Sequence, residues 1–242
     1  TERFFYGWVI VLVGAVLTFL GTGFYSYSRG VFLPSLAEEL AGGSRFEIAM
    51  GFSIAAVTSA LVAPFIGGIL DKYSPKTVIL VGIGFVTGSY LLLSFCQNLI
   101  QFYLIVGLGM GLGMTCMGNL AWHRTIISWF DHWRGRAISL GVLGASLAGV
   151  VMPPLVTSLV EAIGWRSAFV VFAIIVPSIL IPLVIYFLKN RPEEIGEVRD
   201  GHVYSEAHKT TEVEDQTESR IWHWKEMIRF PAFWSIGLMF GA

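Results

Sequence analysis

The stretch IAMGFSIAAVTSALVAPFIGGILDKYSPK, residues 48–76, sets the pattern of the whole chain. Its first part, residues 48–70, carries no charge, and a short polar segment with Asp71, Lys72 and Lys76 follows. An uncharged apolar run of about 20 residues is long enough to cross the hydrocarbon core of a bilayer as one helix. The stretch therefore predicts a membrane-spanning helix that ends in a charged turn.

Composition extends this pattern to nearly all of the 242 residues. Hydrophobic residues make up 55% of the chain and charged residues 14%, against roughly 25% charged residues in an average soluble protein. The net charge of -1 gives no extended basic surface for nucleic acid. Cys96 and Cys116 lie inside apolar runs, without the spacing of a disulfide framework or a thiolate metal site. We therefore expect an integral membrane protein without a metal or a cofactor.

Apolar runs of spanning length recur along the chain and predict an all-α bundle of six membrane-spanning helices. The long uncharged run from residue 77 to residue 121 exceeds one crossing and divides at the polar pair Gln97 and Asn98. The predicted spans are Phe4–Ser28, Ile48–Leu70, the two parts of Thr77–Ala121, Ala137–Val160 and Ser167–Leu188.

Three regions follow from these spans. Residues 1–188 form the predicted six-span N-terminal bundle, and residues 189–229, which carry 17 of the 33 charged side chains, form a predicted solvated linker. Residues 230–242 begin a seventh apolar run that is too short to cross a bilayer. We therefore expect the chain to continue beyond Ala242.

Orientation follows from the basic residues in the connections, because short loops rich in Lys and Arg stay on the cytoplasmic side. Loops with Lys72 and Lys76, and then with Arg134 and Arg136, alternate with loops that hold one arginine or none. We expect the N-terminus and the 189–229 linker to lie in the cytoplasm of a multi-pass protein of the plasma or inner membrane. The first run shows no cleavage signature and is predicted to be a retained span.

Several motifs resemble the first half of a major facilitator superfamily transporter. In residues 67–76 a glycine precedes an aspartate by four positions and basic residues follow, as in the superfamily's loop between spans two and three, although Ser74 and Pro75 replace the usual glycine and arginine. The superfamily's fourth-span arginine would fall at Tyr103 and is absent. Other motifs are similar to those of monocarboxylate and oxalate/formate transporters: Tyr6-Gly7-Trp8, Trp129-Phe130, Arg134-Gly135-Arg136-Ala137 followed by Gly141, Gly144 and Gly149, Gly164-Trp165-Arg166, and Arg191-Pro192-Glu193-Glu194-Ile195-Gly196.

The resemblance implies a secondary transporter in which a second six-span half rocks against this one around a site at the bilayer midplane. It favours a small monocarboxylate of the lactate or pyruvate type, moved with a proton, as the substrate. Two alternatives stay open: exchange of organic anions of the oxalate/formate type, and a non-transporting membrane receptor or assembly half. The sequence shows no nucleophile with a base, no metal cluster and no phosphate loop, so we do not expect an enzyme.

A polar stripe in the first span is the first candidate for the substrate site. Helical spacing places Thr18, Tyr25 and Arg29 on one face. An arginine in hydrocarbon costs at least ~2.5 kcal/mol, so we expect Arg29 to face a watery cavity where its guanidinium pairs with a carboxylate. The alternative is that Arg29 reaches the outer interface or pairs with Glu38 or Glu47.

The fourth and fifth spans supply the other substrate-site candidates. Asn119 and Trp122 share a helical face, and by resemblance Asn119 occupies a polar position that touches the substrate in monocarboxylate transporters. An amide can bind a carboxylate without a counter-charge; the alternative is an interhelical hydrogen bond. Leu143 and Ser146 lie on a polar face of the fifth span, where Leu143 would limit the size of the pocket. His123 is a candidate proton relay or a simple interface residue.

A charged group near the end of the second span is the predicted gate. Asp71 lies at the negative end of its own helix and needs a cation beside it. Lys72, Lys76 and Arg136 are the predicted partners, and Arg134 belongs to the same basic surface. In the resembling family the acid of this loop also contacts the second half in one of the two access states. These five residues therefore form the predicted gating group.

Overall fold

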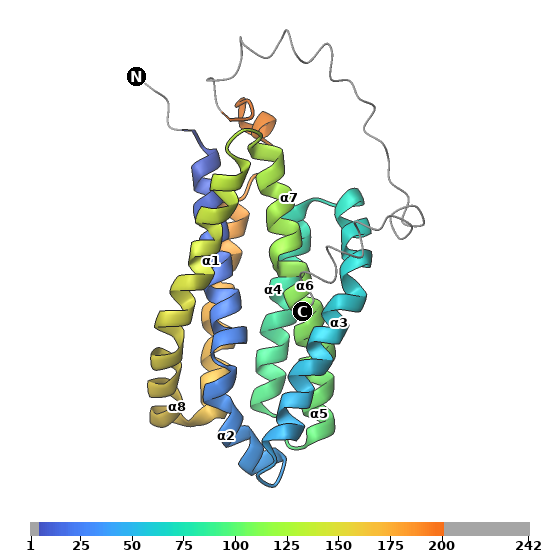
Figure 1. The fold of residues 1–242 in the computed structure, drawn as a ribbon, viewed down its shortest axis with the longest axis vertical. Coiled ribbons are helices and arrows are strands. Elements are labelled where there is room, and N and C mark those ends of the chain that lie inside the picture. Colours follow the sequence, from blue (N-terminus) through green and yellow to red (C-terminus); the bar gives the residue numbers. More distant parts are fainter. Residues whose placement is uncertain (1–4, 201–242) are drawn as a thin grey trace. The chain divides into compact units, whose positions relative to one another are not determined.

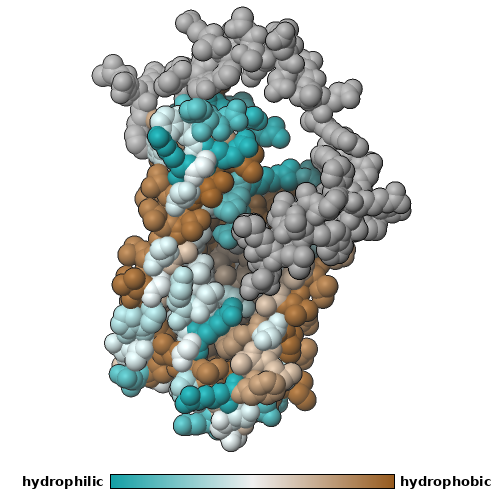
Figure 2. Space-filling view, viewed as in Figure 1, coloured by the Kyte–Doolittle hydropathy of each residue, from teal (hydrophilic) through white to brown (hydrophobic). Residues whose placement is uncertain are grey.

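The computed structural model describes residues 5–200 and shows a bundle of helices that run side by side along one axis (Figure 1). Five helical segments in this range are long and apolar enough to cross a membrane, which confirms the all-α membrane fold. On the face shown in Figure 2, hydrophilic residues gather at the top and bottom of the bundle, and hydrophobic residues mix with pale and a few hydrophilic ones between them. The predicted start of a seventh span at 230–242, and most of the predicted linker, lie outside the described residues.

The first span is longer than predicted and contains a wide turn. Helix α1 (Gly7–Thr22) passes into the π-helical turn η1 (Gly23–Tyr27), and α2 (Arg29–Leu40) continues the same segment. The predicted end at Ser28 is wrong, because this serine is buried and its hydroxyl donates to the carbonyl oxygen of Gly23 at 2.9 Å. A polar side chain that bonds its own helix does not end that helix.

The connection between the second and third spans explains the Ser-Pro pair in the loop motif. Helix α3 (Arg45–Lys72) ends just before α4 (Pro75–Ser94) begins. Ser74 is the N-cap of α4, where its hydroxyl accepts a hydrogen bond from the backbone nitrogen of Thr77 at 3.3 Å. Pro75 occupies the first helical position, where a missing N–H group is tolerated. The departure from the superfamily motif therefore starts a helix.

The fourth span begins where the sequence predicted and is assembled from several pieces. Asn98 caps it, since its side-chain oxygen accepts a hydrogen bond from the backbone nitrogen of Gln101 at 2.9 Å, so the predicted break at Gln97 and Asn98 is confirmed. A second π-helical turn and a break at Gly118 interrupt the span. Its pieces are α5 (Leu99–Leu104), η2 (Ile105–Met110), α6 (Gly111–Met117) and α7 (Asn119–Trp129).

The predicted fifth and sixth spans form one long element, α8 (Arg134–Phe187), which folds back on itself. The chain reverses at Gly164, whose φ of 77° and ψ of 161° are not helical. In Figure 1 the first limb is yellow and the second limb is orange. The predicted loop between the two spans is thus replaced by a turn at one glycine, and residues 165–166 belong to the second limb.

A small polar cluster fixes the end of the bundle at which α8 turns. The indole Nε1 of Trp165 donates to Glu39 Oε2 at 2.7 Å, and Arg166 forms an ion pair with the same carboxylate. Arg166 also donates to the carbonyl oxygen of Cys96 at 2.8 Å. Cys96 is buried, and this burial raises the pKa of its thiol. The cluster links α2, α8 and the α4–α5 connection, and we call this side the Glu39 end.

At the opposite end, residues 189–200 fold back onto the bundle as a strap that includes η3 (Pro192–Ile195). The indole nitrogen of Trp129 donates to the carbonyl oxygen of Lys189 at 3.0 Å. The Asp200 carboxylate accepts hydrogen bonds from the backbone nitrogens of Asp131 and His132 at 2.9 and 2.6 Å. Within residues 189–200 most positions are exposed, while several polar groups bind α7 and the α7–α8 connection, and the solvated linker over residues 189–229 stays a prediction.

Replacement of Gly164 by alanine tests the turn within α8. A Cβ atom at Gly164 meets no atom within 4 Å, so the substitution acts only through the backbone. At this φ and ψ a side chain costs about 1–3 kcal/mol, and we expect thermal unfolding at a lower temperature. The matched control is Gly135→Ala, which also meets no atom but lies in regular helix. Equal melting temperatures for the two variants would contradict the turn.

Candidate functional site

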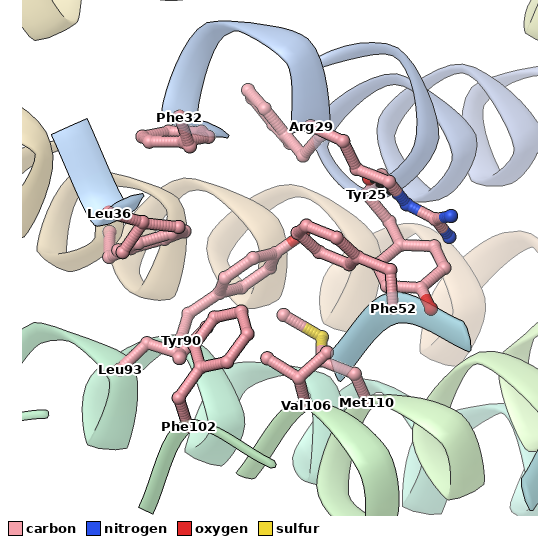
Figure 3. Close-up of a pocket in the computed structure, with 12 residues that line it drawn as sticks. Tyr25, Arg29, Phe32, Leu36, Phe52, Tyr90, Leu93, Phe102, Val106 and Met110 are labelled. Carbon is pink, nitrogen blue, oxygen red and sulfur yellow. Dashed lines mark hydrogen bonds between the residues drawn. The ribbon is translucent and has the colours of Figure 1, made fainter. Parts of the chain in front are cut away.

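Arg29 lies at the edge of a small aromatic pocket inside the bundle (Figure 3). The first span, α3, α4, the fourth span and α8 all contribute to its wall, and its volume is about 20 Å³. That volume is about enough for one water molecule. The lining residues are Phe24, Tyr25, Arg29, Phe32, Leu36, Phe52, Tyr90, Leu93, Phe102, Val106, Met110 and Phe169.

The guanidinium group of Arg29 is held by aromatic rings and not by an acid. Its Cζ atom lies 4.1 Å from the ring centre of Tyr25 and 5.0 Å from that of Phe52, and its Nε donates to the carbonyl oxygen of Tyr25 at 3.1 Å. Among residues 5–200 Arg29 forms no ion pair, so the alternative pairing with Glu38 or Glu47 does not occur there. Stacking fixes the plane of the cation and leaves its charge available to an anion.

The structure splits the predicted polar stripe of the first span. The π-helical turn η1 adds a wide turn between Thr18 and Arg29 and breaks their helical spacing. The hydroxyl of Thr18 donates to the carbonyl oxygen of Gly141 in α8 at 2.9 Å, away from the aromatic pocket. The expectation of one shared face is therefore wrong, and only Tyr25 and Arg29 meet in the pocket.

The break at Gly118 separates the predicted site residues of the fourth span. Asn119 is the first residue of α7 and is exposed. Trp122 is only 1% exposed, because its ring packs against Gly14 and Gly141. The ring of His123 lies 5.1 Å from that of Trp122, and His123 is half-buried. None of these three side chains lines the pocket of Arg29.

The predicted residues of the fifth span are also placed apart from this pocket. Leu143 is 57% exposed, and Ser146 is exposed as well. Both belong to the first limb of α8 and are absent from the pocket lining. The structure thus brings Tyr25 and Arg29 together, while Leu143, Ser146 and Asn119 present surfaces that a bound partner or substrate can still reach.

Asp71 pairs with a residue that the sequence did not predict as its partner. Arg124 Nη1 lies 2.6 Å from Asp71 Oδ1, so the prediction of Lys72, Lys76 or Arg136 as the partner is wrong. Arg124 is reached because α7 brings it beside the end of α3, across a sequence separation of 53 residues. The pair borders a polar cavity of about 630 Å³ between the α3–α4 connection, α7 and the strap.

The other predicted gating residues have separate contacts. Lys72 lines the polar cavity, and Arg134 lines it while pairing with Asp131 at 3.2 Å. Lys76 Nζ donates to the carbonyl oxygen of Ile185 at 2.6 Å and so ties α4 to the end of α8. Arg136 stacks over the ring of Trp133 at 4.3 Å. Lys72 and Arg134 thus share the cavity of Asp71, whereas Lys76, Arg134 and Arg136 bind or stack on other groups.

Comparison with known proteins agrees with this architecture. The profile of the Major Facilitator Superfamily matches residues 15–242. The chain belongs to the major facilitator superfamily. Members of the superfamily transport small molecules across membranes and are not enzymes, and the spanning helices of this chain suit such a multi-pass superfamily protein.

Several curated relatives share this superfamily half. The MFS-type transporter YcxA of Bacillus subtilis is 24% identical over 78% of this chain and 46% of its own length. Monocarboxylate transporter 11 of Homo sapiens is 23% identical over 74% of this chain and 39% of its own. The probable L-galactonate transporter of Escherichia coli is 24% identical over 96% and 49%. The chain spans about half the length, or less, of these superfamily relatives.

Most of the aromatic residues that line the Arg29 pocket were not predicted from the sequence. Phe52, Tyr90, Phe102 and Phe169 come from four different helices, and each lies in an apolar run in which aromatic residues are ordinary. No spacing within one helix indicates that they converge. Tyr103, which stands where the superfamily carries an arginine, donates its hydroxyl to the carbonyl oxygen of Glu47 at 3.0 Å and so ties the fourth span to α3.

The strap and the end of α8 also hold Tyr6, which lies just before α1, through hydrogen bonds. Its backbone nitrogen donates to Glu197 Oε2 at 3.1 Å, and its hydroxyl donates to the carbonyl oxygen of Phe187 at 3.0 Å. Burial, with a smaller contribution from the Glu197 carboxylate, raises the pKa of the Tyr6 phenol. Tyr6 therefore remains a hydrogen-bond donor and joins α1 to the end of α8.

Removal of the Asp200 carboxylate should release the strap. Asp200→Ala leaves the backbone N–H groups of Asp131 and His132 without their acceptor, at a local cost of about 1–3 kcal/mol. We expect faster amide hydrogen exchange in residues 189–200 and in the α7–α8 connection, measured by mass spectrometry. The control is Glu193→Ala, whose exposed side chain has no hydrogen bond within the described part of the chain. Equal exchange in both variants would contradict the docked strap.

Proposed function

We propose that this chain is the N-terminal half of a transporter that moves a small monocarboxylate, of the lactate or pyruvate type, together with a proton by alternating access. The guanidinium of Arg29, which is stacked on two rings and has no ion-pair partner among residues 5–200, carries the proposal. Two relatives are named for carboxylate substrates, as a monocarboxylate and an L-galactonate transporter. The superfamily membership supports the transport class, and Arg29 supports the choice of an anion.

The chemistry of Arg29 explains why an anion is the favoured ligand. A cation within a membrane-spanning helix is costly unless water or an opposite charge compensates it. Helix α2 continues for 11 residues beyond Arg29, to Leu40, so that end of the helix lies about 16 Å away. A carboxylate can bind the planar guanidinium through two parallel hydrogen bonds. The aromatic lining and the small volume disfavour large or highly polar substrates.

The remaining site predictions belong to the same proposal. Asn119, Leu143 and Ser146 are exposed and are proposed to complete the substrate path when the second half is present. His123 is proposed as the proton-coupling residue, because a half-buried imidazole in a spanning helix can change its charge within the transport cycle. The end with Asp71 is proposed to face the cytoplasm of a plasma or inner membrane, in agreement with its basic residues.

Uptake by the complete transporter in liposomes tests the function. Labelled L-lactate should accumulate when an inward proton gradient is imposed and should not accumulate without one. Uptake that is stimulated by internal organic anion, and is indifferent to pH, would replace proton symport by anion exchange. A folded and correctly inserted protein that moves no carboxylate under either condition would contradict the proposed function.

Substitution of Arg29 tests the proposed anion site. In Arg29→Lys a point charge replaces the planar fork and its stacking on Tyr25 and Phe52 is lost, so we expect the KM for lactate to rise by about tenfold. The control is Arg45→Lys at the exposed start of α3, which should leave KM unchanged. An unchanged KM in Arg29→Lys would remove Arg29 from the site.

Substitution of Asp71 tests the proposed gate. The Asp71 and Arg124 side chains are 69% and 45% exposed, so loss of the pair in Asp71→Asn should cost stability no more than about 1 kcal/mol. We expect the transport rate to change while the melting temperature does not. Glu161→Gln, which removes an exposed carboxylate from α8 outside the gating group, serves as the control. Equal transport rates in the two variants would contradict a gating role for Asp71.

A further inference from the structure

The fourth span is a helix in two parts, and its geometry at the junction requires glycine. Gly118 has a φ of -77° and a ψ of -159°, which separates α6 from α7. A Cβ atom on Gly118 would lie 2.5 Å from the carbonyl oxygen of Met114, and a backbone atom cannot give way as a flexible side chain can. Any other residue therefore disfavours the bend. In a regular helix the same position would accept alanine readily.

The part before the junction is held by the second and third spans. A Cβ atom on Gly82 of α4 would lie 2.6 Å from the backbone nitrogen of Met117, and one on Gly111 of α6 would lie 3.0 Å from the carbonyl oxygen of Ala55 in α3. Such glycines allow the helix backbones to approach closely. Close backbone packing on both sides leaves α6 little freedom to move relative to α3 and α4.

The part after the junction contacts α4 and pairs with Asp71 of α3, and through Trp122 it also meets α1 and α8. The indole ring fills a notch formed by Gly14 of α1 and Gly141 of α8, where a Cβ atom on either glycine would overlap the ring. Thr18 donates to the carbonyl oxygen of Gly141 and joins the same two helices directly. Movement of α1 and the first limb of α8 is therefore transmitted to α7 by the buried ring.

We propose that Gly118 is a hinge of the fourth span and that Trp122 is a positioning residue that couples α7 to α1 and α8. The inference rests on the proposed transport function and revises the prediction that Trp122 contacts the substrate. The hinge connects the wall of the Arg29 pocket, which includes Val106 and Met110, to the segment that begins at the exposed Asn119. Bending at Gly118 changes the distance between these two parts and so the width of the substrate path.

Gly118→Ala in the complete transporter tests the hinge. If alanine straightens the span, kcat should fall by about tenfold while KM does not change. The melting temperature should stay the same or rise, because alanine favours a continuous helix. Gly84→Ala and Gly88→Ala are matched controls, since their Cβ atoms meet nothing within 4 Å in another spanning helix. A purely structural role would lower stability and turnover together.

A distance measurement tests the same hinge without any substrate. Spin labels at the exposed positions Leu108 and Ile127 lie on the two parts of the span, and a straight helix would separate their backbones by about 28 Å. We expect a broad distribution in the parent protein and a narrow one near the straight-helix value in Gly118→Ala. Distributions identical to that of Gly84→Ala would overturn the hinge, whereas a shifted distribution with no lactate uptake would overturn only the substrate assignment.

A compensating pair tests the role of Trp122 in case one variant does not fold. Gly14→Ala alone should destabilise the protein, because its methyl group overlaps the ring, and Trp122→Leu added to it should restore the melting temperature. If Trp122 couples the helices, the double variant should keep a turnover about tenfold low despite restored stability. Recovery of turnover together with stability would show that the ring only fills space and would overturn the coupling.

Discussion

The fold depends on one constraint: a chain within a bilayer has no water to satisfy its backbone N–H and C=O groups. Long apolar helices meet this constraint, and the departures from regular helix occur at recognisable sites. The π-helical turn η1 begins at Gly23, and η2 contains Gly107 and Gly109. The reversal in α8 and the break in the fourth span each occur at a glycine.

The two ends of the bundle meet a different requirement, because charged groups there can pair and be hydrated. At the Glu39 end, one carboxylate joins α2 to the second limb of α8. At the other end, the strap gathers α1, α7 and the α7–α8 connection through backbone groups and the Asp200 carboxylate. Both sets of contacts join neighbouring helices at the ends of the bundle.

The sequence was sufficient for the features that depend on local chemistry. Apolar length predicted the spans, the polar pair at 97–98 predicted the break that Asn98 caps, and the charged turn after residue 70 predicted where α3 ends. It was insufficient where the outcome depends on distant groups. Arg124 lies 53 residues from Asp71, and the backbone groups that the Asp200 carboxylate binds lie 68 and 69 residues away from it.

The same distinction explains the result for the candidate site. Tyr25 and Arg29 are one helical turn apart, so their contact is local and was predicted. The spacing that joined them to Thr18 assumed a regular helix, which the π-helical turn does not preserve. The helical face that Trp122 shares with Asn119 predicts a contact with the substrate, but Gly14 and Gly141 form a notch in which the Trp122 ring is buried. These two glycines decide where the Trp122 ring lies, and because they belong to other helices, the sequence around Trp122 does not indicate its position.

The small volume of the pocket beside Arg29 limits what can bind there. The pocket holds about 20 Å³, whereas even a small carboxylate needs more room than one water molecule. Arg29 is stacked on two rings, so a bound anion gains little from movement of the arginine itself, and the walls must separate instead. Part of that wall, at Val106 and Met110, belongs to the fourth span, which also contains the break at Gly118. In the proposed cycle, α7 bends at Gly118 together with α1 and α8, so the first span with Arg29 separates from the wall at Val106 and Met110, which lies before the break.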